Sequence, residues 1–368
     1  MYKITIIAGA RPNFMKIAPI IHALEAAKAK GQPLAYRLVH TGQHYDTNMS
    51  GHFFEQLNIP EPHVNLQCHG GSQAEQTAQI MVAFEQELRA HPANLVLVVG
   101  DVTSTMACAL VAQKLHTKVA HVEGGIRSDD WTMPEEINRL VTDSITNYFF
   151  TTSELANRNL THSGVSEDRI FYVGNTMIDT LLAQQPRFQA PPIWSTLNLK
   201  PQDYIVMTLH RPANVDAETH LKGLIDAIVQ HTRDVPLVFP AHPRTAQILK
   251  RLDIVHPRLH VVEPLGYLEF NYLVQQAKAV ITDSGGITEE ASVMRVPCLT
   301  LRDNTERPET ITLGTNVLVG TNPKALPPHL DTLFEGRWKT GQDIPLWDGH
   351  TAERIVDVLC QFAASQDA

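Results

Sequence analysis

The sequence predicts an α/β protein made of two Rossmann-like, doubly wound parallel-sheet domains. Its 368 residues exceed what one hydrophobic core usually organises. Short apolar runs alternate along the chain with stretches of helical periodicity. This alternation is typical of parallel strands whose connecting helices cover both faces of the sheet. Four prolines interrupt it within Gln184–Asp203, where we place the boundary between the domains.

The first half, residues 1–183, is the expected N-terminal domain. Its apolar runs predict strands over Lys3–Ala8, Ala35–His40, Leu95–Val99, Lys118–Val122, Tyr148–Thr152 and Ile170–Val173. The amphipathic stretches between them predict helices over Asn13–Ala29, Ser72–Arg89, Thr103–Lys114 and Pro134–Ile145. These connections have the length that parallel strands require.

The second half, residues 184–368, repeats the pattern and is the expected C-terminal domain. Its predicted strands are Tyr204–Leu209, Pro236–Pro240, Leu259–Val262, Ala279–Thr282, Pro297–Leu301 and Asn316–Val319. An amphipathic helix over Thr351–Ala363 closes the chain, and it could pack against either domain.

Composition excludes several classes of protein. Lys and Arg number 30 against 39 Asp and Glu, and 30 − 39 gives a net charge of −9, unsuited to binding nucleic acid. No run of 18 apolar residues is available to span a membrane. The four cysteines form no Cys-x-x-Cys pair, and the chain opens directly on a strand-like run, so we expect a cytoplasmic enzyme.

We expect neither a metal nor an organic cofactor. His40 and His44 have helical ligand spacing, but Thr41-Gly42 between them indicates a strand end, and no carboxylate or thiol partner stands at motif spacing. The Gly-x-Gly-x-x-Gly fingerprint of a nicotinamide or flavin site is absent from the sequence.

Carboxylates in the first half follow predicted strands or begin predicted helices. Asp101 and Glu123 should emerge together at the carboxyl edge of the sheet, where α/β proteins bind ligands. Asp101 could instead cap the next helix. Glu135 could complete a capping box with Thr132, and Glu136 could be a first-turn acid favoured by the helix dipole.

The second half offers groups suited to an anion. Asp283–Glu290 follows a strand and opens a helix, where Ser284 can act as the cap. Gly285 and Gly286 would let a phosphate approach bare N–H groups, and Glu290 could accept two ribose hydroxyls. The candidate cations are Arg11, Lys16, His210, Arg211 and Arg307. Arg307 lies in a charge-dense segment that could equally be a solvated loop.

The first half of the chain thus carries carboxylates and the second half carries groups suited to an anion. A ligand with a diphosphate at one end and a mobile proton at the other fits this division, so we predict an enzyme acting on a nucleotide sugar.

Seven motifs together resemble the non-hydrolysing UDP-N-acetylglucosamine 2-epimerase family. They are GARPNFMK at 9–16, GDVTST at 100–105, HVEGGIR at 121–127, MPEEINR at 133–139, HRPAN at 210–214, DSGGITEE at 283–290 and TERPE at 305–309. The resemblance implies a glycosyltransferase-B-like pair of domains with the active site in the interdomain cleft. It implies a UDP-sugar substrate, a homodimer and no nicotinamide.

The resemblance also assigns roles. Asp101, Glu123 and Glu135 would be the acid/base carboxylates, with His210 assisting at the diphosphate. The residues that would hold UDP are Arg11, Lys16, Ser284, Gly285, Gly286, Glu290 and Arg307. The chain departs from the best-known bacterial members after His210, where it reads Arg-Pro-Ala-Asn, and in His69–Gln73, which lacks the glutamine of their activating site. Substrate activation is therefore doubtful.

The predicted reaction is reversible epimerisation at C2 of UDP-GlcNAc by elimination and re-addition of UDP. A modified UDP sugar such as a diacetamido uronic acid is an alternative substrate. A hydrolysing epimerase, a glycosyltransferase of the same architecture and a non-catalytic nucleotide-sugar sensor are the other readings of the same residues.

Overall fold

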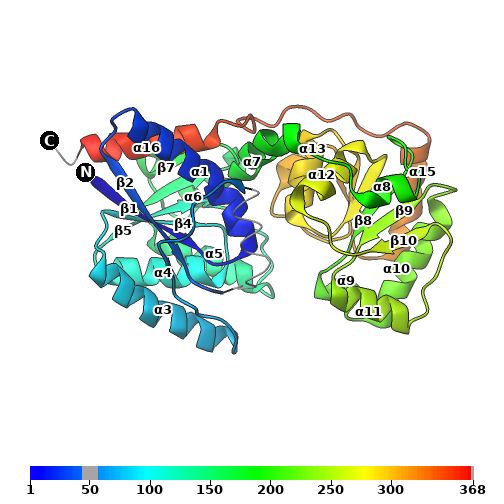
Figure 1. Cartoon of the computed structure of the whole chain (residues 1–368), viewed down its shortest axis with the longest axis horizontal. Coiled ribbons are helices and arrows are strands. Elements are labelled where there is room, and N and C mark those ends of the chain that lie inside the picture. Colours follow the sequence, from blue (N-terminus) through cyan, green and yellow to red (C-terminus); the bar gives the residue numbers. More distant parts are fainter. Residues whose placement is uncertain (44–56, 366–368) are drawn as a thin grey trace. The chain divides into compact units, whose positions relative to one another are not determined.

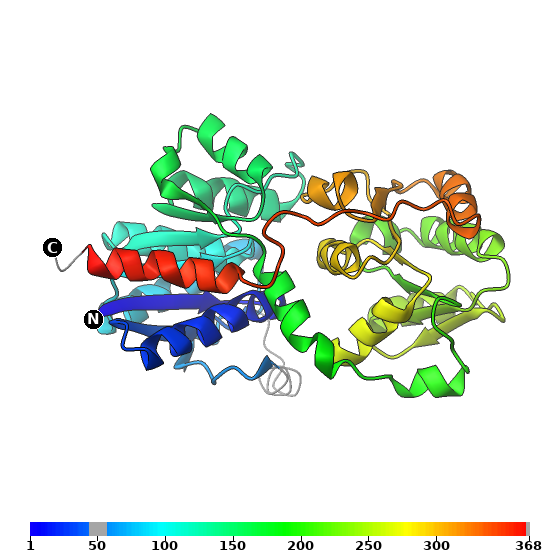
Figure 2. The same cartoon turned by 90° about the horizontal axis from the view of Figure 1, so that it is seen from above.

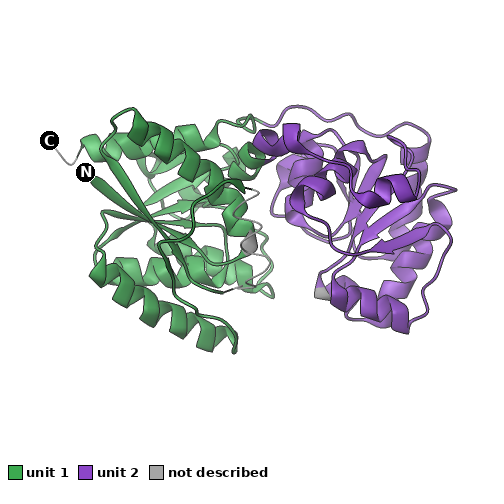
Figure 3. Ribbon diagram, in the orientation of Figure 1, with its two compact units in different colours: residues 1–180, 345–368 green, residues 181–344 purple. Residues whose placement is uncertain are grey.

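The computed structural model describes residues 1–43 and 57–365, apart from the side chains of Arg11 and Pro212. The chain divides into two compact units, coloured separately in Figure 3. Unit 1 contains residues 1–180 and 345–368, and unit 2 contains residues 181–344. Each unit is a parallel sheet with helices on its faces (Figure 1), which confirms the predicted fold class.

Unit 1 has a seven-stranded sheet in the order β3-β2-β1-β4-β5-β6-β7. Its strands are β1 (Tyr2–Ala8), β2 (Leu34–His40), β3 (Val64–Asn65), β4 (Leu95–Val99), β5 (Lys118–Val122), β6 (Tyr148–Thr151) and β7 (Ile170–Tyr172). Its helices are α1 (Arg11–Ala29), α3 (Gln73–Ala90), α4 (Thr103–Lys114), α5 (Pro134–Ile145), α6 (Glu154–His162) and α16 (Thr351–Ala364), while α7 (Thr176–Gln184) runs on into unit 2.

Unit 2 has a six-stranded sheet in the order β10-β9-β8-β11-β12-β13. Its strands are β8 (Ile205–Thr208), β9 (Leu237–Pro240), β10 (Leu259–Val262), β11 (Ala279–Thr282), β12 (Cys298–Thr300) and β13 (Asn316–Leu318). Its helices are α8 (Pro192–Thr196), α9 (Pro212–Val215), α10 (Glu218–His231), α11 (Pro243–Arg251), α12 (Tyr267–Gln276), α13 (Gly285–Val293), α14 (Pro308–Thr312) and α15 (Leu326–Phe334). Both sheets place their first strand next to their fourth, so each has the strand reversal at which doubly wound folds bind ligands.

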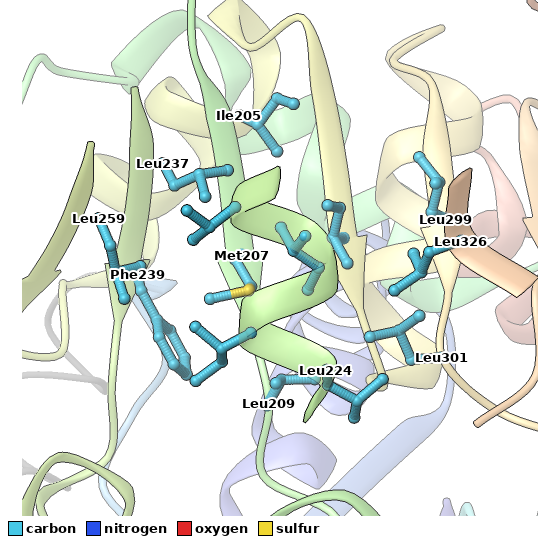
Figure 4. Close-up of a cluster of buried hydrophobic side chains, with 14 of the residues drawn as sticks. Ile205, Met207, Leu209, Leu224, Leu237, Phe239, Leu259, Leu299, Leu301 and Leu326 are labelled. Carbon is cyan, nitrogen blue, oxygen red and sulfur yellow. The ribbon is translucent and has the colours of Figure 1, made fainter. Parts of the chain in front are cut away.

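Apolar strand residues form the core on each face of the two sheets. In unit 2, Met207 and Phe239 from neighbouring strands pack with Leu224 of α10, and Figure 4 shows these side chains together. All three are fully buried. The carboxyl ends of the strands project from this rigid core, so the loops that follow them have fixed starting points.

The C-terminal helix α16 belongs to unit 1, one of the two placements that the sequence left open for it, and unit 2 comprises residues 181–344. Figures 1 and 2 both show α16 beside α1. The N-terminus of α16 is held by Asp179, whose carboxylate accepts hydrogen bonds from the N–H groups of Thr351 and Ala352 at 3.1 and 2.7 Å. Burial of the apolar face of α16, including Ile355 and Leu359, fixes it there.

No helix within the described ranges is both long enough and apolar enough to cross a membrane.

Candidate active site

Two of the predicted carboxylates follow neighbouring strands of the unit 1 sheet. Asp101 comes after β4 and Glu123 directly after β5, and these strands pair in parallel. Both residues therefore lie at the carboxyl edge of the sheet. The alternative role of Asp101 as a helix cap is wrong, because the N-cap of α4 is Val102, whose side chain cannot accept a hydrogen bond.

Glu123 is held in a buried ion pair. Its Oε2 lies 2.7 Å from Nζ of Lys16 on α1, and 4% of the Glu123 side chain is exposed. The backbone of Glu123 has a φ of +71°, an uncommon conformation for a residue other than glycine. Such backbone strain persists where the surrounding structure imposes it, often at functional sites. Lys16, predicted to bind substrate, thus contacts a predicted catalytic residue.

Asp101 contacts the helix that carries Glu135. Its Oδ2 accepts a hydrogen bond from Nη1 of Arg139 at 2.7 Å, and its backbone carbonyl accepts one from Asn138 at 2.9 Å. The Arg139 side chain is 3% exposed, whereas the Asp101 side chain is 33% exposed. The cation is therefore fixed inside the protein while the carboxylate can still be reached by a ligand.

Glu135 lies in the first turn of α5 and is partly exposed. The predicted capping box is wrong, because the N-cap is Met133 and the hydroxyl of Thr132 instead donates to Asp130 at 2.6 Å. Capping therefore does not account for Glu135, and its carboxylate remains a candidate for chemistry.

Glu136 has the structural role that its neighbour lacks. Its buried carboxylate accepts hydrogen bonds from the N–H groups of Ser128 and Asp129 and from Nε of Arg139. Burial opposes ionisation, but the Ser128 and Arg139 donors outweigh it and hold the pKa of Glu136 below its ordinary value. Arg139 thus joins Glu136 to Asp101.

His121 and Asp143 form a buried pair whose contacts were not predicted. Nδ1 of His121 lies 2.7 Å from Oδ1 of Asp143, and Nε2 lies 2.7 Å from the carbonyl oxygen of Gly100. A histidine inside the otherwise apolar end of a strand was the signal available in the sequence. Polar groups at such positions need hydrogen-bond partners.

The loop before Arg11 is fixed, although the Arg11 side chain itself lies outside the described residues. Oδ1 of Asn13 accepts hydrogen bonds from the N–H groups of Gly9 and Ala10, both at 3.0 Å. Its Nδ2 donates to the carbonyl of Val99 at the end of β4. Arg11 therefore begins α1 at the same sheet edge as Asp101.

In unit 2, His210 follows β8 and is oriented by Asp283, which follows the adjacent β11. Nδ1 of His210 lies 2.8 Å from Oδ1 of Asp283, and the N–H of Arg211 donates to the same carboxylate. Burial opposes ionisation of Asp283, but donors from His210 and Asn214 hold its pKa below the ordinary value. Because 54% of the His210 side chain is exposed, Nε2 is left to meet a ligand.

The N-terminus of α13 has the features of an anion site. Ser284 occupies the predicted N-cap position, although within the described residues its side chain makes no capping hydrogen bond. Gly285 and Gly286 follow as the first helical residues. If Gly285 carried a Cβ, the nearest described atom outside the adjacent residues and the helix's own backbone would be Nη1 of Arg302, 3.9 Å away. Open N–H groups at a helix start bind anions readily.

Glu290 is buried one turn further along α13. Tyr267 Oη donates a hydrogen bond to its Oε1 at 2.8 Å. Burial raises the pKa of Glu290 to about 7, with a further contribution from the charge of Glu289 and against the hydrogen bond from Tyr267. Near neutral pH this carboxyl group therefore holds a proton for part of the time.

Arg307 is 6% exposed, so the alternative reading of its segment as a solvated loop is wrong at this residue. Its Nε donates to the carboxylate of Glu289 on α13. Burial raises the pKa of the following Glu309 to about 7, although the charge of Arg307 opposes this. The hydrogen bond to Glu289 fixes the guanidinium of Arg307 beside the helix that begins with Ser284 and Gly285.

Within residues 1–43 and 57–365, no group of three His, Cys, Asp or Glu side chains has a geometry that could hold a metal ion. His40 is buried, which lowers its pKa to about 4. His44, the other member of the predicted spacing, lies outside the described residues.

The segment His69–Gln73, which lacks the family's glutamine, forms the start of α3. The N–H of Ser72 donates to Oε2 of Glu75 at 2.7 Å, while the hydroxyl of Ser72 accepts from the N–H of Glu75 at 3.2 Å. This reciprocal pair is a capping box and explains Ser72 without a ligand.

A model of the family described as UDP-N-acetylglucosamine 2-epimerase matches residues 26–360. The chain belongs to the UDP-N-acetylglucosamine 2-epimerase family. A UDP-N-acetylglucosamine 2-epimerase from Methanocaldococcus jannaschii is 40% identical over 370 residues, covering 97% of this chain and 98% of the relative. These matches confirm the family predicted from the motifs.

Two further likenesses bear on substrate and fold. A UDP-2,3-diacetamido-2,3-dideoxy-D-glucuronate 2-epimerase from Pseudomonas aeruginosa is 41% identical over 322 residues, covering 86% of this chain and 88% of the relative. The crystal structure of the Methanocaldococcus jannaschii epimerase in complex with UDP-GlcNAc and UDP matches with a TM-score of 0.85 at 40% identity, over 98% of this chain and 99% of that chain.

Proposed function

We propose that this epimerase-family chain interconverts UDP-GlcNAc and UDP-ManNAc by inverting C2 of the sugar, with no added cofactor. One observation carries the proposal. Asp101 and Glu123 follow adjacent parallel strands, and each carboxylate is paired with a cation, the buried Arg139 and the partly buried Lys16 respectively. Carboxylates fixed in this way keep a set orientation toward a bound sugar, and Asp101 stays reachable from solvent.

The reaction needs two proton-transfer groups. The C2 proton beside an acetamido group is only feebly acidic, so direct removal is unfavourable. Departure of UDP from C1 with loss of the C2 proton gives a 2-acetamidoglucal and UDP. UDP then returns to C1 while a proton is delivered to the other face of C2, which inverts that centre. We assign the acid and base roles to Asp101, Glu123 and Glu135.

The leaving diphosphate needs stabilisation, which we assign to the candidate cations of both units and to the N-terminus of α13 in unit 2. His210 and the open N-terminus of α13 at Ser284, Gly285 and Gly286 would receive its negative charge. Arg11, Lys16 and Arg307 would add positive charge, and Glu290 would bind the ribose hydroxyls. We infer that the bound substrate is shielded from water during turnover, which would protect the glucal.

A second substrate has a specific observation in its favour. The Pseudomonas aeruginosa diacetamido-uronate epimerase matches this chain at 41% identity, about as well as the UDP-GlcNAc enzyme. The same elimination at C2 would operate on that sugar, because its C2 also bears an acetamido group. The two candidates differ in substrate and share the chemistry.

Incubation in heavy water with each UDP sugar tests the proposal. We expect deuterium at C2 of both epimers of the true substrate, with UDP remaining attached at equilibrium. Release of free sugar and UDP would instead indicate a hydrolysing epimerase. Transfer to an acceptor without deuterium uptake would indicate a glycosyltransferase, and UDP-sugar binding without any reaction would indicate a sensor.

We also infer a homodimer, on the family resemblance alone. Sedimentation equilibrium of the full chain should give twice the 41.0 kDa chain mass. A mass equal to that of one chain would overturn this inference.

A further inference from the structure

His121 has hydrogen-bond acceptors facing both of its ring nitrogens. The side chain is fully buried in β5. The acceptor at Nε2 is the backbone carbonyl oxygen of Gly100, 2.7 Å away. A carbonyl oxygen can only accept a hydrogen bond, so Nε2 must carry a proton.

The acceptor at Nδ1 is an ionised carboxylate. Asp143 also receives Nη1 of Arg127 at 2.6 Å and the N–H of Gly125 at 3.0 Å, both on Oδ2. The permanently charged guanidinium of Arg127 and the N–H donor of Gly125 favour the ionised form of this carboxylate. An ionised carboxylate donates nothing, so Nδ1 of His121 must carry a proton too. Either neutral tautomer would turn a lone pair toward an oxygen 2.7 Å away.

We propose that His121 is a buried imidazolium and that, together with Asp143, it is a positioning residue for the acid/base carboxylates. This role rests on the epimerisation proposed above. His121 holds the carbonyl of Gly100, and the peptide bond formed by that carbonyl leads directly into Asp101. The hydrogen bond from the N–H of Gly100 to the carbonyl of Val122 fixes the other side of the same turn.

Asp143 connects the remaining two carboxylates. Its Oδ2 holds the N–H of Gly125, two residues beyond Glu123. Asp143 itself lies on α5, the helix whose first turn contains Glu135. The His121–Asp143 pair therefore contacts the segments that carry Asp101 and Glu123 directly, and it includes a residue of the helix that carries Glu135, about two turns further along.

Close packing gives this arrangement little freedom to shift. A Cβ on Gly124 would lie 2.8 Å from the Phe149 ring and 3.5 Å from both Nδ1 of His121 and Oδ1 of Asp143. A Cβ on Gly125 would lie 2.4 Å from the carbonyl oxygen of Ala156. The paired glycines after Glu123 thus let the chain pass tightly over the buried pair.

Nuclear magnetic resonance of the full chain with nitrogen-labelled histidine tests the charge on His121. We expect two ring N–H signals from His121 at neutral pH, assigned by their loss in His121→Gln. A single N–H signal, with the second ring nitrogen unprotonated, would overturn the proposal. This readout needs no turnover, so it decides the charge even if the proposed activity is absent.

Kinetics test the positioning role. His121→Gln and Asp143→Asn should each lower kcat for C2 exchange on the order of 100-fold, as expected for a small misplacement of catalytic groups. KM, the affinity for UDP and the fraction of chains that bind UDP should stay unchanged, whereas general misfolding would lower that fraction. His91→Gln, at an exposed position beyond α3, is the control and should leave kcat unchanged. Unaltered kcat in both test variants, or a loss confined to KM, would overturn the positioning role.

Discussion

The ammonium group of Lys16 and the carboxylate of Glu123 form an ion pair that is almost completely shielded from water, with 14% and 4% of the two side chains exposed. The pair joins the first helix of unit 1 to the end of β5. Two charges so placed depend on each other, because a lone buried charge has neither water nor a counter-ion. Lys16 therefore contributes to the fold as well as to any ligand that it meets.

Replacing Lys16 with methionine should destabilise the protein by roughly 3–5 kcal/mol, because it removes the ammonium group that lies 2.7 Å from the buried Glu123 carboxylate. Urea unfolding followed by circular dichroism measures this change. The double variant with Glu123→Gln is the matched control and should recover most of the loss. A Lys16→Met protein as stable as the wild type would show that the pair does not hold the fold.

Asp101→Asn should abolish turnover and leave UDP affinity nearly intact. The amide keeps the shape of the side chain but cannot take up a proton, and the groups assigned to UDP lie on other elements. Isothermal titration with UDP and the heavy-water exchange assay measure the two effects. A loss of UDP affinity of about tenfold or more, roughly 1.4 kcal/mol, would make Asp101 a structural residue instead.

Gly285→Ala should weaken UDP binding while leaving stability unchanged or slightly improved. Its Cβ would have room in the protein, and alanine favours a helix by about 1 kcal/mol over glycine. The added methyl group would, however, occupy the approach to the α13 N–H groups. Gly223→Ala in α10 is the matched control, since its Cβ would meet only Pro323 at 3.7 Å. Equal UDP affinity in both variants would show that no phosphate approaches Gly285.

Glu290 should make stability fall as pH rises toward neutrality. Its pKa is raised from 4.5 to about 7 by burial, so the folded state binds a proton that the unfolded state has released. The stabilisation is fully present below pH 4.5 and is lost as pH rises through about 7. Its size is on the order of a few kcal/mol.

Urea unfolding of Glu290→Gln at a series of pH values checks this sign, because glutamine cannot titrate. The variant should show a flatter pH dependence than the wild type between pH 4.5 and about 7. Glu309→Gln provides the comparison, since burial raises the pKa of Glu309 to about 7 as well. An unchanged slope in Glu290→Gln would mean that Glu290 is already ionised in the folded protein.

The element pattern was predictable because parallel sheets leave a strong signal in the sequence. The strands Leu95–Val99 and Ala279–Thr282 and the helix Thr103–Lys114 have the predicted bounds. Each is a continuous apolar run or a periodic stretch with a clear end. By contrast, β3 has only two residues, Val64–Asn65, too few to show any periodicity, and it was missed.

Local capping rules were less informative at the site. They offered Asp101 and Thr132 as possible caps, whereas α4 and α5 begin after Val102 and Met133, and at the correctly predicted N-cap Ser284 the hydroxyl makes no capping bond within the described residues. Those rules consider only the next three residues. The actual contacts are long-range, such as Asp101 with Arg139, 38 residues apart, and no local pattern encodes them.

The orientation of the proposed catalytic groups was also not encoded in local sequence patterns. His210 was predicted as a site residue, but its partner Asp283 is 73 residues away and was noted only as the start of a motif. His121 and Asp143 form their pair across 22 residues. Such buried polar partners become visible only once the sheet brings adjacent strand ends together.

The central claim is that UDP leaves and returns while C2 exchanges its proton. It is tested most directly by incubating UDP-GlcNAc, carrying a heavy isotope of oxygen in the bond between C1 and the diphosphate, in heavy water. We predict that the label migrates to the non-bridging oxygens of the β-phosphate as deuterium enters C2 of both epimers. Deuterium entry into both epimers with the oxygen label fixed in its bridge would contradict elimination, and no deuterium at C2 with either UDP sugar would contradict epimerisation itself.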